Sequence, residues 1–223
     1  MTHDGHRMRM RKRFLNEGID SFEPHEILEL LLYFAIPRRD INELAHKLID
    51  HFGNIANVLD ADVYALQQVE GVGENAAVLL TLIPQLSRVY QTAKWDRNII
   101  LGDTETAGEY AKSLFIGKKN EEFAIICLDS QRRVHYSGTV VRGTVNQTEA
   151  YPRLIVSEAL KHNAQNIILA HNHPSGNPRP SPEDVETTKT LVAALEAIDV
   201  YVIDHIIVGG NRFYSMTEMG TIL

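Results

Sequence analysis

Residues 7 to about 92 show the apolar spacing of helices that bury one face. One apolar run follows Ser21 and Glu23, residue types typical of helix N-termini. A second stretch ends at Gly53, a common helix stop, and places on one face Ile41, Leu44, Leu48 and Ile49. Two further helices are expected on either side of the turn Val69-Glu70-Gly71-Val72-Gly73. The pattern predicts a small all-α domain over residues 1–95.

The pattern changes after this region. Residues 96–103 are largely polar and lack a helical stripe, so we expect a linker there. Beyond it, short apolar runs typical of buried strands alternate with amphipathic stretches. The expected strands are 121–129, 134–143, 166–173, 200–210 and 212–216, and the expected helices are 105–116, 150–163 and 181–198. This alternation is typical of a layered α/β domain with a mixed sheet, here over residues 104–223.

Composition narrows the class of protein without identifying it. The chain has 223 residues and a formal net charge of -7 at pH 7, which argues against nucleic-acid binding over its whole surface. The dense basic run within residues 7–13 is interpreted as a solvated terminal segment. A single cysteine, Cys127, excludes an intramolecular disulfide framework and a cysteine-rich zinc cluster. No apolar stretch approaches the roughly 20 residues that cross a bilayer, and no signal peptide is recognisable, so we expect no membrane association and a cytoplasmic protein.

The segment that carries chemistry runs from Ala170 to Asp184. His171 and His173 lie two positions apart at the carboxyl end of an expected strand, where alternate side chains point to the same side. A loop rich in proline and glycine then returns the chain to Asp184. Two imidazoles and one carboxylate suit Zn²⁺ and leave a fourth coordination position for water. His171, His173 and Asp184 are therefore predicted to bind one zinc ion per chain.

Each part of this group also has a purely structural explanation. Two histidines at a strand end are often only a surface pair. Ser181 is a good helix N-cap, with Pro182 at the first helical position and Asp184 completing a capping box. The combination of two histidines, a rigid loop and a carboxylate is more specific than any one part, and it favours the metal site.

These residues resemble the JAMM (MPN+) metalloprotease pattern, in which His-x-His is followed by serine and aspartate at the spacing of Ser181 and Asp184. Further motifs resemble the RadC branch of that superfamily in particular. They are HNHPSG, VRGT (141–144), YPR (151–153) and IDHIIVG (203–209). The resemblance covers nearly the whole chain. It implies a three-layer, deaminase-like JAMM/MPN domain preceded by a helix-hairpin-helix domain. One departure is Leu154, because the family usually has glutamate after the proline-arginine pair.

The resemblance also implies roles for single residues. The family has a glutamate general base directly before an apolar strand; Glu122 is predicted to be that residue, and Glu121 is the competing assignment. Neighbours on a strand face opposite ways, so only one of them can reach the metal. Ser181 resembles the serine that donates a hydrogen bond to the developing oxyanion. Asp204 is either a carboxylate that orients a metal ligand or, as we favour, part of a strand-end polar pair.

The reaction implied by the resemblance is hydrolysis of a peptide or isopeptide bond, with an unknown protein or peptide as substrate. A competing hypothesis is a DNA-associated protein, in repair or as a metal-dependent nuclease, with weak contact through the hairpin Gly71–Gly73. Glu74 and Asn75 stand where such hairpins usually carry lysine, which favours helix packing as the role of the turn.

Other metal chemistries fit the residues less well. Nucleases more often use oxygen-rich magnesium or two-metal sites, which two histidines and one carboxylate match poorly. A zinc deaminase needs a cysteine pair, and Cys127 is the single cysteine of the chain. A non-catalytic scaffold that has lost its ligands is disfavoured because all three ligand positions are filled. Neither the substrate nor the oligomeric state can be predicted from the sequence.

Overall fold

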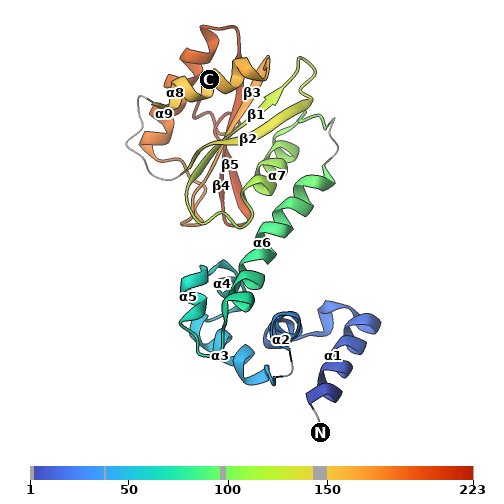
Figure 1. Cartoon of the computed structure of the whole chain (residues 1–223). Helices are drawn as coiled ribbons and strands as arrows, with labels where there is room; N and C mark the ends of the chain where they lie inside the picture. The colour runs from blue at the N-terminus through green and yellow to red at the C-terminus, as the bar shows by residue number, and fades with distance from the viewer. Residues whose placement is uncertain (1–2, 38, 96–98, 143–149, 223) are drawn as a thin grey trace. The chain divides into compact units, whose positions relative to one another are not determined.

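A computed structural model describes residues 3–37, 39–95, 99–142 and 150–222 (Figure 1). The chain divides into two compact units, Met1–Ser87 and Arg88–Leu223. The division falls inside helix α6 (Glu74–Lys94), upstream of the linker expected at 96–103. Residues 96–98 of that linker lie outside the described part of the chain.

The N-terminal unit is helical, as the apolar spacing predicts. Its helices are α1 (His3–Glu17), the 3-10 turn η1 (Ile19–Ser21), α2 (Pro24–Ala35), α3 (Asn42–Phe52), α4 (Ile55–Asp60), α5 (Val63–Gln67) and the start of α6. A capping box between Glu23 and Glu26 begins α2, and Gly53, at φ 88°, ends α3. The core of this unit is formed by fully buried leucines, among them Leu28, Leu32, Leu48, Leu66 and Leu80. No helix in the described ranges has the length and apolar character to cross a bilayer.

The C-terminal unit alternates helices with strands, which confirms the predicted α/β class. Its elements are α7 (Thr104–Phe115), β1 (Glu122–Leu128), β2 (Val134–Arg142), α8 (Ala150–Lys161), β3 (Asn166–Asn172), α9 (Pro182–Glu196), β4 (Tyr201–Gly209) and β5 (Arg212–Ser215). The strands form one mixed sheet in the order β2-β1-β3-β4-β5. Only the β3–β4 pair is parallel, and the other pairs are antiparallel.

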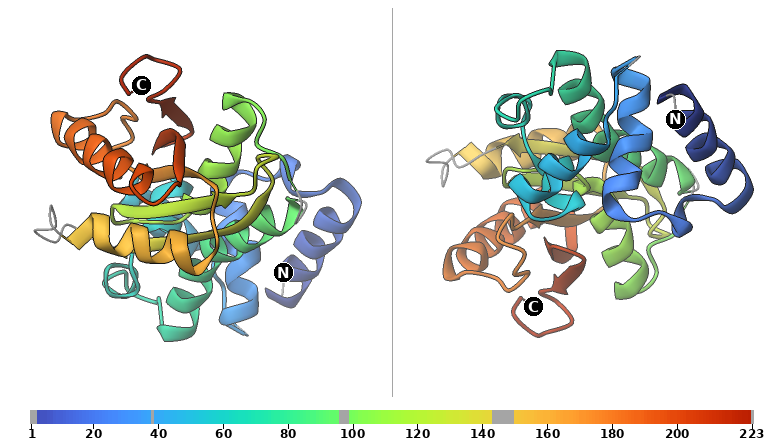
Figure 2. Two further views of the ribbon diagram at one scale, coloured as in Figure 1. Left: turned by 90° about the horizontal axis from the view of Figure 1, so that it is seen from above. Right: turned by 90° about the horizontal axis from the view of Figure 1, so that it is seen from below.

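Ribbon views show helices on both faces of the sheet (Figures 1 and 2). Side-chain alternation along the strands separates two cores, one on each face. The face toward α7 buries even-numbered residues of β1 and β3, namely Ala124, Ile126, Leu128, Ile168 and Ala170. The face toward α8 and α9 buries the odd-numbered residues Phe123, Ile125, Cys127, Ile167 and Leu169. This arrangement gives three layers, and the same alternation decides which polar side chains meet at the ends of β1 and β3.

Candidate metal centre

The structure brings His171, His173 and Asp184 together at the end of β3. His171 is 1% exposed near the strand end, His173 follows the strand, and Asp184 lies in the first turn of α9. The Nε2 atoms of the two histidines are 2.9 Å apart, and they lie 3.3 and 3.4 Å from the two carboxylate oxygens of Asp184. Ligands about 2.1 Å from a tetrahedral zinc ion would be separated by about 3.4 Å. The three side chains are therefore spaced as ligands of one small ion.

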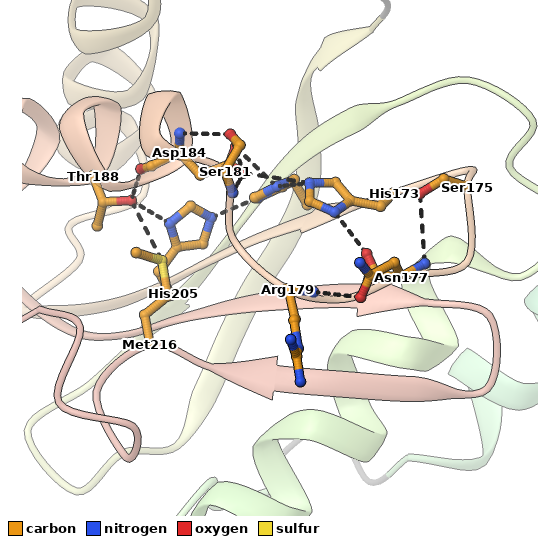
Figure 3. A network of polar contacts seen from close by, with 10 residues as sticks. His173, Ser175, Asn177, Arg179, Ser181, Asp184, Thr188, His205 and Met216 are labelled. Atoms are coloured by element: carbon orange, nitrogen blue, oxygen red, sulfur yellow. Dashed lines mark hydrogen bonds and ion pairs between the residues drawn. The ribbon is translucent and has the colours of Figure 1, made fainter.

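The ring of His173 is oriented by the loop that follows it (Figure 3). Its Nδ1 lies 2.8 Å from the carbonyl oxygen of Asn177. A carbonyl can only accept a hydrogen bond, so Nδ1 must carry the ring proton. In the neutral ring, Nε2 then presents a lone pair toward His171 and Asp184.

The ring of His171 is oriented by a buried chain of hydrogen bonds through His205 and Thr188; Figure 3 shows the last two residues. Thr188 Oγ1 lies 2.5 Å from the carbonyl oxygen of Asp184 and 2.6 Å from Nδ1 of His205. Because the threonine donates to that carbonyl, His205 Nδ1–H donates to the threonine, and His205 Nε2 is left as an acceptor. His171 Nδ1 lies 2.7 Å from that acceptor and carries the proton. The lone pair of His171 Nε2 is thereby aimed at the same point as that of His173.

Charges around the site favour a cation at this point. Burial opposes ionisation of Asp184, but the pKa of Asp184 lies below its usual value, and its carboxylate accepts hydrogen bonds from the Ser181 hydroxyl and backbone N–H. Burial lowers the pKa of His205 well below the usual value and keeps its ring neutral. Two imidazole lone pairs 2.9 Å apart beside a carboxylate repel one another unless a positive charge lies among them. This donor set fits Zn²⁺.

The glutamate that joins these ligands is Glu121. Its carboxylate, the two imidazoles and the Asp184 carboxylate each offer one ligand atom, and these atoms all lie within 4.8 Å of one another. The placement predicted for Glu122 is therefore corrected to its competitor, Glu121. The catalytic role of this glutamate stays a prediction.

Glu122 is held on the other face of the sheet. Its carboxylate accepts hydrogen bonds from Lys118 Nζ at 2.7 Å and from Thr139 Oγ1 at 3.0 Å. Glu121 directly precedes β1 and has the same odd-numbered parity as Phe123, which pairs directly with His171. The strand pattern was read correctly, but the choice between two adjacent glutamates needed the register of β1 against β3.

Ser181 takes the position expected from the helix-start interpretation. Its Oγ accepts from the backbone N–H of Asp184 at 3.1 Å, and the Asp184 carboxylate accepts from the Ser181 N–H and Oγ–H, each at 2.7 Å. This is a complete capping box at the start of α9. The same hydroxyl therefore positions a carboxylate of the candidate site, and its role toward an oxyanion stays a prediction.

Asp204 joins β4 to the segment after β5. Its carboxylate accepts from Ser215 Oγ at 2.6 Å and from the Thr217 N–H at 3.1 Å, which agrees with the favoured strand-end interpretation. The side chain that orients a ligand is its neighbour, His205, which sequence reasoning missed. The available signal was the polar His205 within the apolar run IDHIIVG. In the structure His205 pairs with Leu169 of β3.

The loop between His173 and α9 lies directly on the end of β4. A Cβ atom on Gly209 would lie 2.5 Å from the backbone nitrogen of Pro178 and 2.7 Å from the carbonyl carbon of Asn177. Both distances are shorter than nonbonded contacts allow. Glycine at this position therefore lets the loop approach closely enough for the Asn177 carbonyl to reach His173.

The hairpin Gly71–Gly73 connects α5 to α6. Gly71 has φ 100°, a conformation that favours glycine. The adjacent Val69 and Val72 are buried in the helical core, at 7% and 6% exposure. These contacts are those of a helix-packing turn, and DNA contact stays a prediction. Of the other motifs, Gly143 and Thr144 lie outside the described residues, and Leu154 is exposed on α8.

A mixed sheet covered by helices on both faces, with paired histidines at a strand end and an aspartate at the next helix N-terminus, defines a JAB (JAMM/MPN) domain with a candidate metal-binding group. Residues 101–221 match the family model described as RadC-like JAB domain, and residues 4–78 match the one described as UPF0758 N-terminal. The chain belongs to the RadC family of the JAMM/MPN superfamily.

Proposed function

We propose that this protein is a zinc-dependent hydrolase of the JAMM metalloprotease type, which cleaves a peptide or isopeptide bond. The observation that carries the proposal is the convergence of two imidazole lone pairs and one carboxylate within 3.4 Å, next to a second carboxylate. His171, His173 and Asp184 hold the ion. When bound, zinc polarises a carbonyl group and lowers the pKa of a coordinated water to about 7.

The protein's own groups supply the proton transfers. Glu121 accepts a proton from the attacking water at a carboxylate oxygen and returns it to the leaving amine. Ser181 donates its Oγ–H to the oxygen of the substrate carbonyl after this hydroxyl rotates away from the Asp184 carboxylate that accepts from it. One such donor contributes about 100- to 1,000-fold in rate.

The first test is the metal content of the purified protein. We expect one zinc ion per chain, and the His173→Ala variant should lose it. In structural zinc sites roughly 10–16 kcal/mol of binding free energy is divided among about four ligands, so the loss of one ligand costs several kcal/mol. The His135→Ala variant is a matched control, because that ring contacts the carbonyl of His162 outside the site. Stoichiometric zinc in His173→Ala would show that the ligand assignment is wrong.

The second test separates the two glutamates. Zinc-loaded protein is assayed on a panel of linear peptides and lysine isopeptides, together with the Glu121→Gln and Glu122→Gln variants. We expect Glu121→Gln to retain zinc and lose at least about 100-fold in turnover. Glu122→Gln should keep turnover, because its amide oxygen can still accept from Lys118 and Thr139 on the opposite side of the sheet. The reverse order would reassign the general base.

A further inference from the structure

The middle residue of the His-Asn-His segment contacts the chain on both sides of Glu121. Asn172 is 5% exposed, although it lies between two metal-ligand candidates. Its Oδ1 accepts a hydrogen bond from the backbone N–H of Glu122 at 2.9 Å. Its Nδ2 donates to the backbone carbonyl oxygen of Asn120 at 3.1 Å. One amide group thus holds the peptide units before and after Glu121.

These two bonds lie where the regular pairing of β1 with β3 stops. The last paired residues at this end are Phe123 and His171. Glu121 precedes the first residue of β1, so the β1–β3 ladder does not hold it. Beyond this pair, the side chain of Asn172 joins the end of β3 to the backbone at the start of β1. Glu121 is therefore held by a side chain where the backbone pairing has ended.

Contacts of Glu122 on the other face of the sheet determine which way the Glu121 side chain points. Glu122 is tied to Lys118 and Thr139, which keeps its side chain on the α7 side of the sheet. With Glu122 fixed there and both neighbouring peptide groups bonded to Asn172, the Glu121 side chain points to the opposite face. That is the face from which His171 and Asp184 converge.

We propose that Asn172 is a positioning residue that holds Glu121 beside the metal ligands. The amide is suited to this task because it both accepts from an N–H and donates to a carbonyl, whereas aspartate lacks the donor and leucine lacks both groups. The strand end that supplies both histidine ligands then also sets the position of the general base. This inference rests on the proposed function only for what Glu121 does; the placement itself requires no substrate.

The direct test is amide hydrogen exchange of Glu122, measured by NMR in the zinc-loaded full chain. In the Asn172→Leu variant, loss of the Oδ1 acceptor should accelerate this exchange by about 5- to 10-fold, while the Ile125 amide inside β1 keeps its rate. Asn166→Leu is the matched control, because Asn166 lies at the other end of β3 and donates in the same way to the carbonyl of Asp129. An unchanged Glu122 rate in Asn172→Leu would overturn the inference.

A double-mutant cycle tests whether Asn172 acts through Glu121. In the wild-type background, Asn172→Leu should lower turnover while zinc affinity, measured by chelator competition, is retained. In the Glu121→Gln background, the same change should cause no further loss, because the group it positions is already inactive. Equal losses in both backgrounds would contradict a positioning role.

The Asn172→Asp variant covers the case in which leucine disrupts folding. It keeps the shape and the acceptor but places a carboxylate oxygen against the Asn120 carbonyl. We expect slow exchange at Glu122, retained zinc and reduced turnover, and full turnover would overturn the inference. Zinc-free wild-type protein, or full turnover in Glu121→Gln, would instead refute the proposed function and leave the exchange result standing on its own.

Discussion

The N-terminal unit buries one carboxylate, the C-terminal unit half-buries another, and the two are surrounded by opposite kinds of groups. In the N-terminal unit, Glu29 is 1% exposed and accepts hydrogen bonds from His6 Nε2 at 3.0 Å, from Asn42 Nδ2 at 3.2 Å and from the hydroxyl of Tyr33. Burial, reinforced by Glu29, raises the pKa of Tyr33, so its hydroxyl keeps the proton that it donates. Every contact in this cluster pairs a donor with an acceptor.

The candidate metal centre of the C-terminal unit is built from hydrogen-bond acceptors. The ring protons of His171 and His173 are both used on the far side, by His205 and by the Asn177 carbonyl. Both remaining lone pairs face Asp184. The comparison shows that the balance of donors and acceptors separates a buried structural cluster from a candidate ion site, where burial and residue type alone do not.

Metal removal is expected to give the largest contrast between the units. With free zinc at about 1,000 times Kd, binding stabilises the folded C-terminal unit by about 4 kcal/mol, and a chelator removes that amount. The N-terminal unit should keep its stability, because its carboxylate is satisfied by protein donors. Hydrogen exchange of core amides, followed separately for Leu80 and Ile168 with and without chelator, measures both. Equal destabilisation of both units would remove the distinction.

Glu29→Ala is expected to act in the opposite unit. It leaves the Tyr33 hydroxyl and the Asn42 amide without their buried acceptor, at a cost of about 3 kcal/mol in unfolding free energy. Zinc content should not change. Glu43→Ala is the control, since the Glu43 side chain is 84% exposed in its pair with Lys47 and should have little effect. Denaturant titration provides the measurement, and a loss of zinc in Glu29→Ala would contradict the independence of the two clusters.

His205→Ala tests the orienting chain behind His171. Without the acceptor at His205 Nε2, the ring of His171 can take other orientations and the other tautomer. We expect zinc affinity to fall by about 10- to 100-fold, the range usual for partners of metal-bound histidines. Competition with a fluorescent chelator measures the change, and an affinity equal to that of wild type would show that His171 is oriented by packing alone.

Ionisation of Cys127 should make a smaller, pH-dependent contribution to the free energy of unfolding. Burial, followed by the charge of Glu158, raises the pKa of this thiol to about 12. Because the unfolded thiol ionises near pH 9 while the folded one stays protonated, the folded state binds more protons between these values. Unfolding free energy should therefore be unaffected by this group below about pH 8 and fall by up to about 1.4 kcal/mol per pH unit above about pH 9. Urea titrations at pH 8 and 10 should show a shallower fall for Cys127→Ala.

Local patterns were enough to predict much of this structure. The apolar runs of β1 and β3 read as buried strands, Ser181-Pro182-Glu183-Asp184 read as a helix start, and Gly53 read as a helix stop, because each depends on neighbours in sequence. The grouping of His171, His173 and Asp184 followed from spacing within one strand and one short loop.

What escaped prediction depends on pairing between distant segments. Choosing between Glu121 and Glu122 requires the partner of Phe123 in β3, 48 positions later in the chain. The orienting role of His205 requires knowing that β4 lies parallel to β3, with His205 beside Leu169. His205 stands out as a polar residue in an apolar run, but neither strand partner can be read from the nearby sequence. Local periodicity therefore predicted the elements, and only the strand pairing shows that Glu121 lies beside the candidate ligands.

Gly209, the last residue of β4, affects the candidate ion site through the packing of the backbone around it. The smallest added side chain, a methyl group, would displace the segment around Asn177 and Pro178, and with it the carbonyl that fixes the proton on His173. We therefore expect a substitution at the end of β4, on a residue outside the candidate ligand set, to weaken zinc binding at the candidate site. The space that the backbone leaves at Gly209 therefore bears on ion binding, although the residue has no side chain and is not among the candidate ligands.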